Sequence, residues 1–165
     1  METATTNKTS MLIDKAHELM EERGLLERGW RISLNNAKST AGVCNYSKKT
    51  IFLSRFYLKH HDVDTSWDTI THEVAHALVG PGHGHGRVWR TQHIRLGGSG
   101  DRTFSLEGKV KEEYVRSAKW TGTCPKNPEH TFTRNRLTKA ARSGSCSRCS
   151  STFSKELQIK WTKNY

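Results

Sequence analysis

Apolar residues recur at spacings of three and four over residues 65–79, which is the period of a helix with one buried face. The stripe consists of Trp67, Ile70, Val74, Ala77 and Leu78. Thr65 or Ser66 can cap the start of this helix, with Asp68 in its first turn. The segment 80–82 (Gly-Pro-Gly) ends it, because proline cannot continue a helix and glycine tolerates the turn. The pattern predicts an amphipathic helix that ends near residue 79.

The remaining elements follow from the same kind of periodicity. They are a helix from Thr9 or Ser10 to about residues 22–28, a half-buried strand over residues 30–34, a hairpin over residues 41–44 and 50–53, and a helix over residues 87–96. The glycine-rich segment 97–100 ends the last helix. Strands grouped between helices in this way predict an α+β fold, with helices packed on a short mixed sheet.

Composition limits the core and suggests a partner. Only 33% of the 165 residues are hydrophobic and 26% are charged, so the core is modest and part of the chain is expected to rely on metal for stability. The net charge is +11; residues 100–165 contribute +8 (14 basic and 6 acidic) and residues 1–99 contribute +3 (13 and 10). A basic tail is the electrostatic footprint of a nucleic-acid partner, although a solvated surface has the same composition.

The chain contains no apolar run of the length that spans a membrane, and its first ten residues are polar. Its four cysteines are Cys44, Cys124, Cys146 and Cys149. Cys44 stands alone and is expected to be a small buried side chain of the sheet. The other three have the spacing of metal ligands, and in a reducing compartment this suggests metal ligation rather than disulfides. We therefore expect an intracellular protein, cytoplasmic or associated with the nucleoid or nucleus, that is not secreted.

A His-Glu-x-x-His motif lies at residues 72–76, inside the amphipathic helix predicted over residues 65–79. Histidines four residues apart lie on one helix face, where His72 and His76 can bind a single zinc ion. Glu73 then lies beside the metal, placed to take a proton from a metal-bound water. The alternative is a helix with two surface histidines. The motif favours the centre of a zinc-dependent peptidase, in a small zincin-like domain.

A catalytic zinc needs three protein ligands and one open position. The histidines that follow the motif helix are His83, His85 and His93. A metzincin would place glycine three residues and histidine six residues after His76, but Val79 and Gly82 occupy those positions. Spacing alone does not decide whether His83 or His85 is the third ligand. His93 is expected at the surface or beside a ligand.

Motifs on both sides of residues 72–76 resemble those of the SprT-like metallopeptidases, the family that includes Spartan. They are Trp30-Arg31-Ile32-Ser33-Leu34, Ala41-Gly42-Val43-Cys44, Ile51-Phe52-Leu53-Ser54 and Gly84-His85-Gly86-x-x-Trp89. The resemblance covers about residues 10–165 and implies that His85 is the third zinc ligand, with His83 as its rival. It also implies zinc-dependent endopeptidase activity on DNA-bound or DNA-crosslinked proteins, and a zinc-ribbon-like tail.

A second metal site is predicted in the tail. Its candidate ligands are Cys124, His130, Cys146 and Cys149. The last two form a Cys-x-x-Cys knuckle, and a tetrahedral zinc needs two more ligands. His130, six residues after Cys124, would close the tetrahedron. Many zinc ribbons use a second Cys-x-x-Cys instead, but Lys126 and Asn127 stand where its partner would fall. A redox dithiol is the alternative, although no thioredoxin-like pattern surrounds the pair.

The predicted ribbon would present arginines together with aromatic residues, a combination suited to phosphate contact and base stacking. The expected nucleic-acid contacts are Arg134, Arg136, Lys139, Arg142 and Arg148. Phe132 and Trp120 can stack on bases or belong to the ribbon core. We expect a metallopeptidase domain over residues 10–100, a linker or strand over 101–118 and a zinc-ribbon-like basic module over 119–165.

Together these residues support a specific hypothesis. Three histidines hold a catalytic zinc, Glu73 is the general base, and an extended peptide lies along the sheet edge near residues 50–53. We expect a protein substrate, DNA as a partner, no membrane, a monomer, and zinc at one catalytic and one structural site. The alternative is a non-enzymatic zinc protein that binds nucleic acid, or an adaptor with a degenerate peptidase fold.

Overall fold

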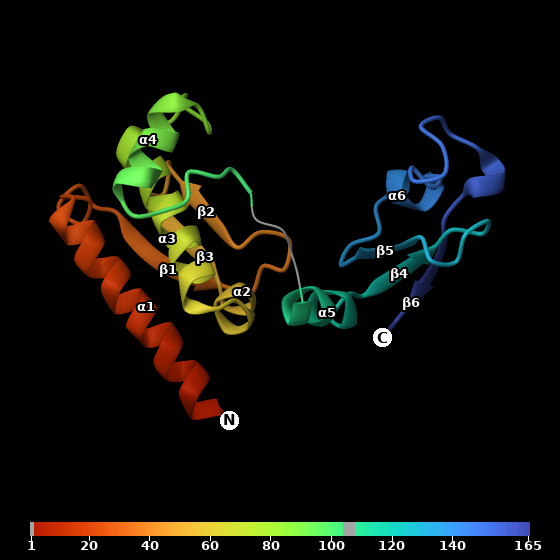
Figure 1. Cartoon of the computed structure of the whole chain (residues 1–165), viewed down its shortest axis with the longest axis horizontal. Coiled ribbons are helices and arrows are strands. Elements are labelled where there is room, and N and C mark those ends of the chain that lie inside the picture. The colour runs from red at the N-terminus through yellow and green to blue at the C-terminus, as the bar shows by residue number, and fades with distance from the viewer. Residues whose placement is uncertain (1, 104–107) are drawn as a thin grey trace. The chain divides into compact units, whose positions relative to one another are not determined.

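The computed structural model describes residues 2–103 and 108–165. The chain forms two compact units, Met1–Val110 and Lys111–Tyr165. The first unit combines helices with a three-stranded sheet, and the second is built on another three-stranded sheet (Figure 1). The predicted α+β class is confirmed. No helix among the described residues is long and apolar enough to span a membrane.

The first helix, α1 (Glu2–Glu22), begins earlier than the sequence pattern predicts. Neither glycine nor proline interrupts residues 2–8, so the helix continues through the predicted caps instead of starting there. Lys8 helps to hold this part of the helix, because its Nζ donates to the backbone carbonyl of His61 over 2.7 Å. The buried side of α1 consists of Leu12, Ala16, Leu19 and Met20.

The sheet of the first unit is mixed, with strand order β1-β3-β2. The strands are β1 (Arg31–Asn35), β2 (Gly42–Asn45) and β3 (Thr50–Ser54). β1 and β3 run parallel, whereas β2 and β3 form the predicted antiparallel hairpin. Hydrogen-bonded neighbours flank β3 on both sides, so it has no free edge. The prediction that a peptide lies along the edge near residues 50–53 is therefore wrong, because the edge strands are β1 and β2.

A short helix, α2 (Arg55–His60), leads into the motif helix α3 (Val63–Val79). Asp62 caps α3: its side chain accepts a hydrogen bond from Thr65 N over 2.7 Å. The predicted cap at Thr65 or Ser66 is wrong, because the earlier aspartate already satisfies N–H groups of the first turn. At the other end Gly80 takes a φ of 82°, which glycine adopts without strain, and the helix ends directly before it as predicted.

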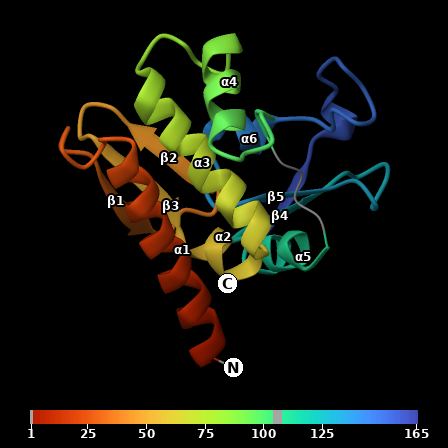
Figure 2. The same ribbon diagram turned by 60° about the vertical axis from the view of Figure 1, so that its left-hand side comes forward.

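The core of the first unit lies around α3. This helix packs across β2 and β3, and α1 and α4 (Arg87–Arg95) pack beside it (Figures 1 and 2). The fully buried side chains of this core include Ile51 and Leu53 from β3 and Ile70 and Val74 from α3. Their packing fixes the rotation of α3 about its own axis, and so decides which way the motif side chains point.

The second unit is built on an antiparallel sheet of order β5-β4-β6. Its elements are β4 (Trp120–Thr123), β5 (Thr131–Arg134), α6 (Lys139–Ser143), the 3₁₀ turn η1 (Lys155–Leu157) and β6 (Lys160–Lys163). Gly122 in the central strand lets Trp161 lie across it, because a Cβ there would come within 2.9 Å of the indole ring. The small core of this unit consists of Cys124, Cys146, Leu157 and Ile159.

The segment 101–118, predicted as a linker or strand, contains the helix α5 (Gly108–Arg116). Residues 109–116 include neither glycine nor proline, and their lysine, glutamate and arginine side chains favour a helix. The strand prediction is therefore wrong over this part of the segment. Residues 104–107 of the predicted linker lie outside the described residues.

Candidate metal sites and the adjoining cleft

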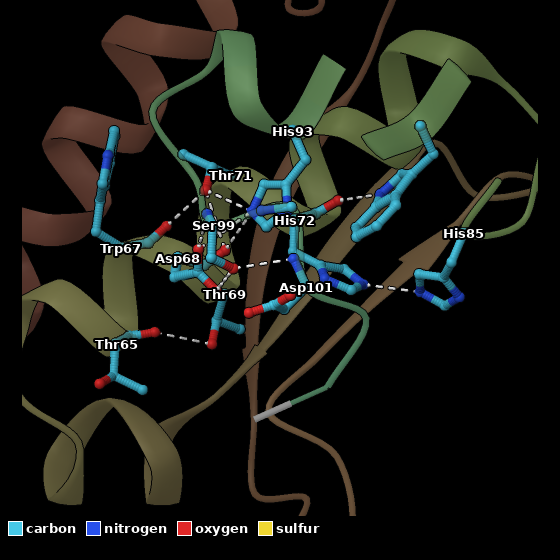
Figure 3. A network of polar contacts seen from close by, with 12 residues as sticks. Thr65, Trp67, Asp68, Thr69, Thr71, His72, His85, His93, Ser99 and Asp101 are labelled. Carbon is cyan, nitrogen blue, oxygen red and sulfur yellow. Dashed lines mark hydrogen bonds and ion pairs between the residues drawn. The ribbon is translucent and has the colours of Figure 1, made fainter. Parts of the chain in front are cut away.

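Three histidines of the first unit direct their ring nitrogens at one point. His72 and His76 lie one turn apart on α3, and His85 lies between α3 and α4. Nε2 of His85 is 3.0 Å from Nε2 of His72 and 3.2 Å from Nε2 of His76. Figure 3 shows the rings of His72 and His85 facing each other. The structure thus brings together three predicted ligands, which we call the histidine cluster.

These distances fit a tetrahedral metal ion. Bonds of about 2.0–2.1 Å from zinc to imidazole nitrogens place neighbouring nitrogens about 3.3–3.4 Å apart. A neutral imidazole carries one N–H, so Nε2 of His85 cannot satisfy both facing nitrogens by hydrogen bonding alone. A cation at the point of convergence satisfies all three. The cluster can therefore hold a metal ion, and zinc as its occupant stays a prediction.

The surroundings favour neutral imidazoles, the form that binds metals. Burial, helped by the neighbouring histidines, lowers the pKa of His72 to about 3. Burial also lowers the pKa of His76 to about 4. The pKa of His85 is lowered by burial and by the nearby charge of Arg102. The lowered pKa values therefore favour the neutral form of all three imidazoles, each of which can offer one ring nitrogen to a metal.

The other two candidate ligands lie outside the cluster. His83 is exposed, and its carbonyl accepts a hydrogen bond from Gly86 N over 3.0 Å in the turn before α4. His93 is fully buried on α4, and its ring centroid lies 5.4 Å from that of His72. Of the two expectations for His93, a place beside a ligand is therefore correct and a surface position is wrong.

Glu73 is buried beside the histidine cluster, with 7% of its surface exposed. Its side chain packs against Gly42 of β2, where a Cβ would lie 2.6 Å from Cγ of Glu73. Burial raises the pKa of Glu73 to about 7, although a hydrogen bond from the backbone of Cys44 acts to lower it. A carboxyl group whose pKa lies near neutrality is suited to accept and return a proton.

A cleft of about 690 Å³ opens beside the cluster, and its wall includes Gly42, Val43, Cys44, His72, Glu73 and His85. The β2 part of this wall belongs to an edge strand. The carbonyl of Ala41 accepts from Ser54 N on β3. Alternate residues of an antiparallel strand face the partner strand, so the backbone groups of Gly42 and Cys44 face away from β3. The cleft is large enough to receive an extended peptide segment.

Cys44 is half-buried and lines the cleft, so the expectation of a small buried side chain holds only in part. Burial and the charge of Glu73 raise the pKa of its thiol to about 12. A thiol with so high a pKa forms little thiolate near neutral pH, which makes it a poor nucleophile and a poor metal ligand. Cys44 therefore contributes to the wall of the cleft rather than to its chemistry.

A second group of donor atoms, the Cys/His cluster, consists of Cys124, His130, Cys146 and Cys149. Sγ of Cys124 and Sγ of Cys149 are 3.8 Å apart, far longer than a disulfide bond of about 2.05 Å. Nδ1 of His130 lies 3.3 Å from Sγ of Cys149 and 3.5 Å from Sγ of Cys146. Tetrahedral zinc gives sulfur–sulfur separations of about 3.8 Å and sulfur–nitrogen separations of about 3.5 Å. The group can therefore hold a metal ion.

Turns next to the strands position these donor atoms. Cys149 N donates to the carbonyl of Cys146 over 3.1 Å, which closes the knuckle. Cys124 directly follows β4, and its N donates to the carbonyl of His130 over 3.1 Å. Burial acts to raise the pKa of Cys124, but backbone hydrogen bonds from residues 126 and 127 lower it below its usual value. The thiol of Cys149 shifts the other way, because burial and the neighbouring thiols of Cys146 and Cys124 raise its pKa to about 11. Zinc, which binds the thiolate, would have to displace that proton.

The predicted nucleic-acid contacts are all exposed on the second unit: Arg134, Arg136, Lys139, Arg142 and Arg148. The guanidinium of Arg142 lies 5.6 Å from the ring centroid of Trp120, and that of Arg148 lies 5.3 Å from Phe132. The other two arginines border a hollow of about 410 Å³. Both aromatic rings are partly buried, so each packs in the unit while keeping some exposed surface. Contact with nucleic acid stays a prediction.

Sequence reasoning missed the acidic residue that connects the histidine cluster to the loop after α4. Asp68 accepts a hydrogen bond from Ser99 N over 2.6 Å and another from Ser99 Oγ over 3.2 Å. No motif contains these residues. The one available signal is spacing, since Asp68 precedes His72 by four residues and therefore lies on the same face of α3.

The fold and the histidine cluster define an α+β domain in which three histidines can hold a metal ion, with an acidic group buried at the wall of an open cleft. A model of the SprT-like family matches residues 10–112, more than half of the chain, so the chain belongs to the SprT-like family. This membership suggests a metallopeptidase-like function. The match spans the histidine cluster and ends before the Cys/His cluster. No curated protein and no solved structure matches the chain significantly.

Proposed function

We propose that this protein is a zinc-dependent endopeptidase. The observation that carries the proposal is the convergence of three Nε2 atoms, 3.0 Å and 3.2 Å apart, at the wall of a cleft that Glu73 also lines. Catalytic zinc sites have three protein ligands and an open position, whereas structural sites have four ligands. The histidine cluster has three candidate ligands and the Cys/His cluster has four. The first therefore suits catalysis and the second suits structural support.

Zinc held by the histidine cluster would supply a Lewis acid that polarises a peptide carbonyl and makes water more acidic. Glu73 takes the proton of the attacking water and returns it to the leaving amine. Its pKa of about 7 suits both transfers near neutral pH. The Cys44 backbone hydrogen bond and the absence of a side chain at Gly42 keep the carboxylate in place.

The substrate in this proposal is an extended peptide that pairs with the edge of β2. The backbone N–H of Cys44 already donates to Glu73. The groups that β2 offers to a peptide are therefore the backbone of Gly42 and the carbonyl of Cys44. Main-chain pairing of this kind places few demands on substrate side chains. Selectivity must then come from the way the protease is delivered to its substrate.

Glu73→Gln tests the mechanism directly. The amide keeps the size of the side chain but cannot accept a proton as the carboxylate does. We expect an unchanged zinc content and casein cleavage at least about a hundredfold slower, as for the loss of a general base. A variant that keeps its zinc and cleaves at the wild-type rate would remove Glu73 from the mechanism.

We further propose that the second unit tethers the protease to DNA, so that DNA-bound or DNA-crosslinked proteins are its substrates. Two observations support this: residues 100–165 carry a net charge of +8, and exposed arginines lie over aromatic rings. Cationic and aromatic side chains together contact phosphates and stack on bases. Tethering would raise the concentration of the protease near DNA-bound proteins without any side-chain selectivity.

Cleavage of a DNA-bound protein, measured with and without its DNA over a range of salt concentrations, tests the tether. A tethered protease cleaves faster when DNA is present and loses this advantage as salt rises, because salt weakens phosphate contacts. A non-enzymatic protein binds DNA with a steep salt dependence and cleaves nothing. An adaptor shows neither salt-dependent DNA binding nor cleavage, and binds a protein partner instead. If cleavage is equally fast with and without DNA at low salt, the proposed DNA tether is wrong and the proposed protease activity still stands.

A further inference from the structure

The loop after α4, residues 97–101, folds around the buried ring of His93, and we call it the His93 loop. Gly98 N donates to the carbonyl of His93 over 3.0 Å, and Gly100 N donates to its Nδ1 over 3.2 Å. Gly98 passes so close to the ring that a Cβ would lie 2.0 Å from Nε2 of His93. The segment predicted only as a helix end is therefore a loop shaped by a specific side chain.

These hydrogen bonds also fix the orientation of the His93 ring. Because Gly100 donates to Nδ1, that nitrogen carries a lone pair and the ring proton lies on Nε2. Nε2 faces acceptors on α3: Thr71 Oγ1 at 3.1 Å, the Asp68 carbonyl at 3.2 Å and Asp68 Oδ1 at 3.4 Å. His93 therefore connects α4 and its loop to α3, one turn before His72.

Asp68 makes a second connection to the same loop. Its carboxylate accepts from Ser99 N over 2.6 Å and from Ser99 Oγ over 3.2 Å. Ser99 Oγ in turn accepts a hydrogen bond from Asp101 N over 3.0 Å (Figure 3). The backbone of Asp101 is hydrogen-bonded to His72. A continuous path of hydrogen bonds thus runs from the carboxylate of Asp68 to the first residue of the histidine cluster.

Aromatic side chains restrict His72 as well. The ring of Trp89 lies 4.6 Å from that of His72 between centroids, and Trp89 Nε1 donates to the backbone carbonyl of His72 over 3.3 Å. The ring of His93 lies 5.4 Å away from that of His72. Packing of this density limits the rotation of the His72 side chain. The His93 loop and Trp89 therefore act on the same imidazole.

We propose that Asp68 is a positioning residue for the histidine cluster: it holds the His93 loop through Ser99, and the loop holds the His72 ring with Nε2 directed at the metal. Groups behind a ligating histidine commonly fix its ring, and their loss weakens metal binding by about 10–100-fold. The inference rests on the proposed function, because it takes the cluster to be the catalytic metal site.

A purely structural role for Asp68 is the competing explanation. Its side chain is 32% exposed, so removal of the carboxylate leaves no large cavity in the core. A structural role would lower the stability of the metal-free protein and affect metal binding only through folding. A positioning role lowers the metal affinity of the histidine cluster in a protein that remains folded. Metal affinity and metal-free stability together therefore separate the two explanations.

The experiment compares Asp68→Ala with the matched control Asp64→Ala in the whole chain. Asp64 is an exposed aspartate one turn earlier on α3, so its replacement removes the same charge away from the His93 loop. Cobalt(II) is the probe, because thiolate ligands give charge-transfer bands that histidine ligands do not. Competition with a chelator then gives the cobalt affinity of each cluster separately, and thermal unfolding of the metal-free proteins reports their stability.

We expect Asp68→Ala to weaken cobalt binding at the histidine cluster by about 10–100-fold relative to Asp64→Ala. The thiolate bands and the metal-free melting temperature should match those of the control. Ser99→Ala should weaken binding in the same direction, and the double variant should lose less than the sum of both, since the residues share one path. Unchanged cobalt affinity in Asp68→Ala overturns the positioning role of Asp68 and leaves the proposed function standing. A wild-type histidine cluster that binds no cobalt overturns the proposed function, and the inference with it.

Discussion

The side chain of Glu73 lies directly against Gly42: a Cβ on Gly42 would come within 2.6 Å of Cγ and 2.8 Å of Oε1 of Glu73. The motif helix and an edge strand of the sheet therefore meet at the proposed general base. Burial in this position raises the pKa of Glu73 to about 7. Glycine at residue 42 is thus what allows the carboxylate to sit beside the histidine cluster.

We expect Gly42→Ala to displace the carboxylate of Glu73 without removing a metal ligand. Zinc content should stay at the wild-type level, while kcat for casein cleavage should fall by about tenfold or more, since a shift of about 1 Å can cost about a hundredfold. Gly144→Ala is the matched control, because an added Cβ at that glycine of the second unit meets no atom closer than 3.4 Å and lies outside the cleft. A wild-type kcat in Gly42→Ala would show that Glu73 is not held by this contact.

His85→Ala and His83→Ala form a matched pair, because both remove an imidazole from the turn before α4. We expect His85→Ala to lose zinc from the histidine cluster and to lose cleavage, since two ligands hold zinc far less tightly than three. His83→Ala should keep both. Zinc per chain, measured after dialysis against a weak chelator, gives the result. Loss of zinc in His83→Ala but not in His85→Ala would reverse the assignment of the third ligand.

The Cys/His cluster should hold the second unit together, because only a small core supports it. Structural zinc supplies on the order of 10 kcal/mol of binding free energy, which becomes folding free energy when the site forms only in the folded state. We expect Cys146→Ser to unfold the second unit and Cys44→Ser to leave it folded. Thermal unfolding and limited proteolysis would report this. A folded second unit in zinc-free Cys146→Ser would show that the metal is dispensable there.

Asp62 should stabilise α3 in a pH-dependent way. The backbone hydrogen bond from Thr65 holds the pKa of Asp62 below its usual value. A carboxyl group of lowered folded-state pKa stabilises the fold above its unfolded-state pKa, and this contribution is lost as pH falls through the folded-state pKa. We expect Asp62→Ala to lower the free energy of unfolding by about 1 kcal/mol at neutral pH, and by less below about pH 4.

Denaturant unfolding of wild type, Asp62→Ala and Asp64→Ala at neutral and acidic pH checks this expectation. Asp64 lies on the same turn, but Asp62 is the residue that caps the helix. The Asp64 variant should therefore show a smaller loss at neutral pH. A loss in Asp62→Ala that is the same at both pH values would mean that the cap does not depend on the charged carboxylate.

The placement of His72, Glu73 and His76 on one helix followed from sequence because helical periodicity is local information. The third ligand could not be identified in this way, because spacing from the helix does not separate His83 from His85. Only the family resemblance favoured His85, and the structure brings that residue to the other two. Which ring reaches the cluster depends on the turn before α4, where Gly82 and Gly84 adopt positive φ angles that no spacing rule specifies.

The His93 loop and the strand order were not predictable for a related reason. Glycines at 97, 98 and 100 have the same local signature whether a helix ends in solvent or its loop wraps a buried ring. The parallel pairing of β1 with β3 joins segments well apart in sequence, and it is this pairing that leaves β1 and β2 as the edge strands. Both features depend on tertiary contacts, which hydrophobic periodicity does not encode.

Stepwise zinc loading of the metal-free protein, with casein cleavage measured at each step, tests the central claim most directly. The Cys/His cluster should fill first, because thiolate ligands bind zinc more tightly. Cleavage should then appear only as the histidine cluster fills, and it should be absent from His85→Ala at every zinc level. Full cleavage by a protein whose zinc occupies the Cys/His cluster alone would contradict the account.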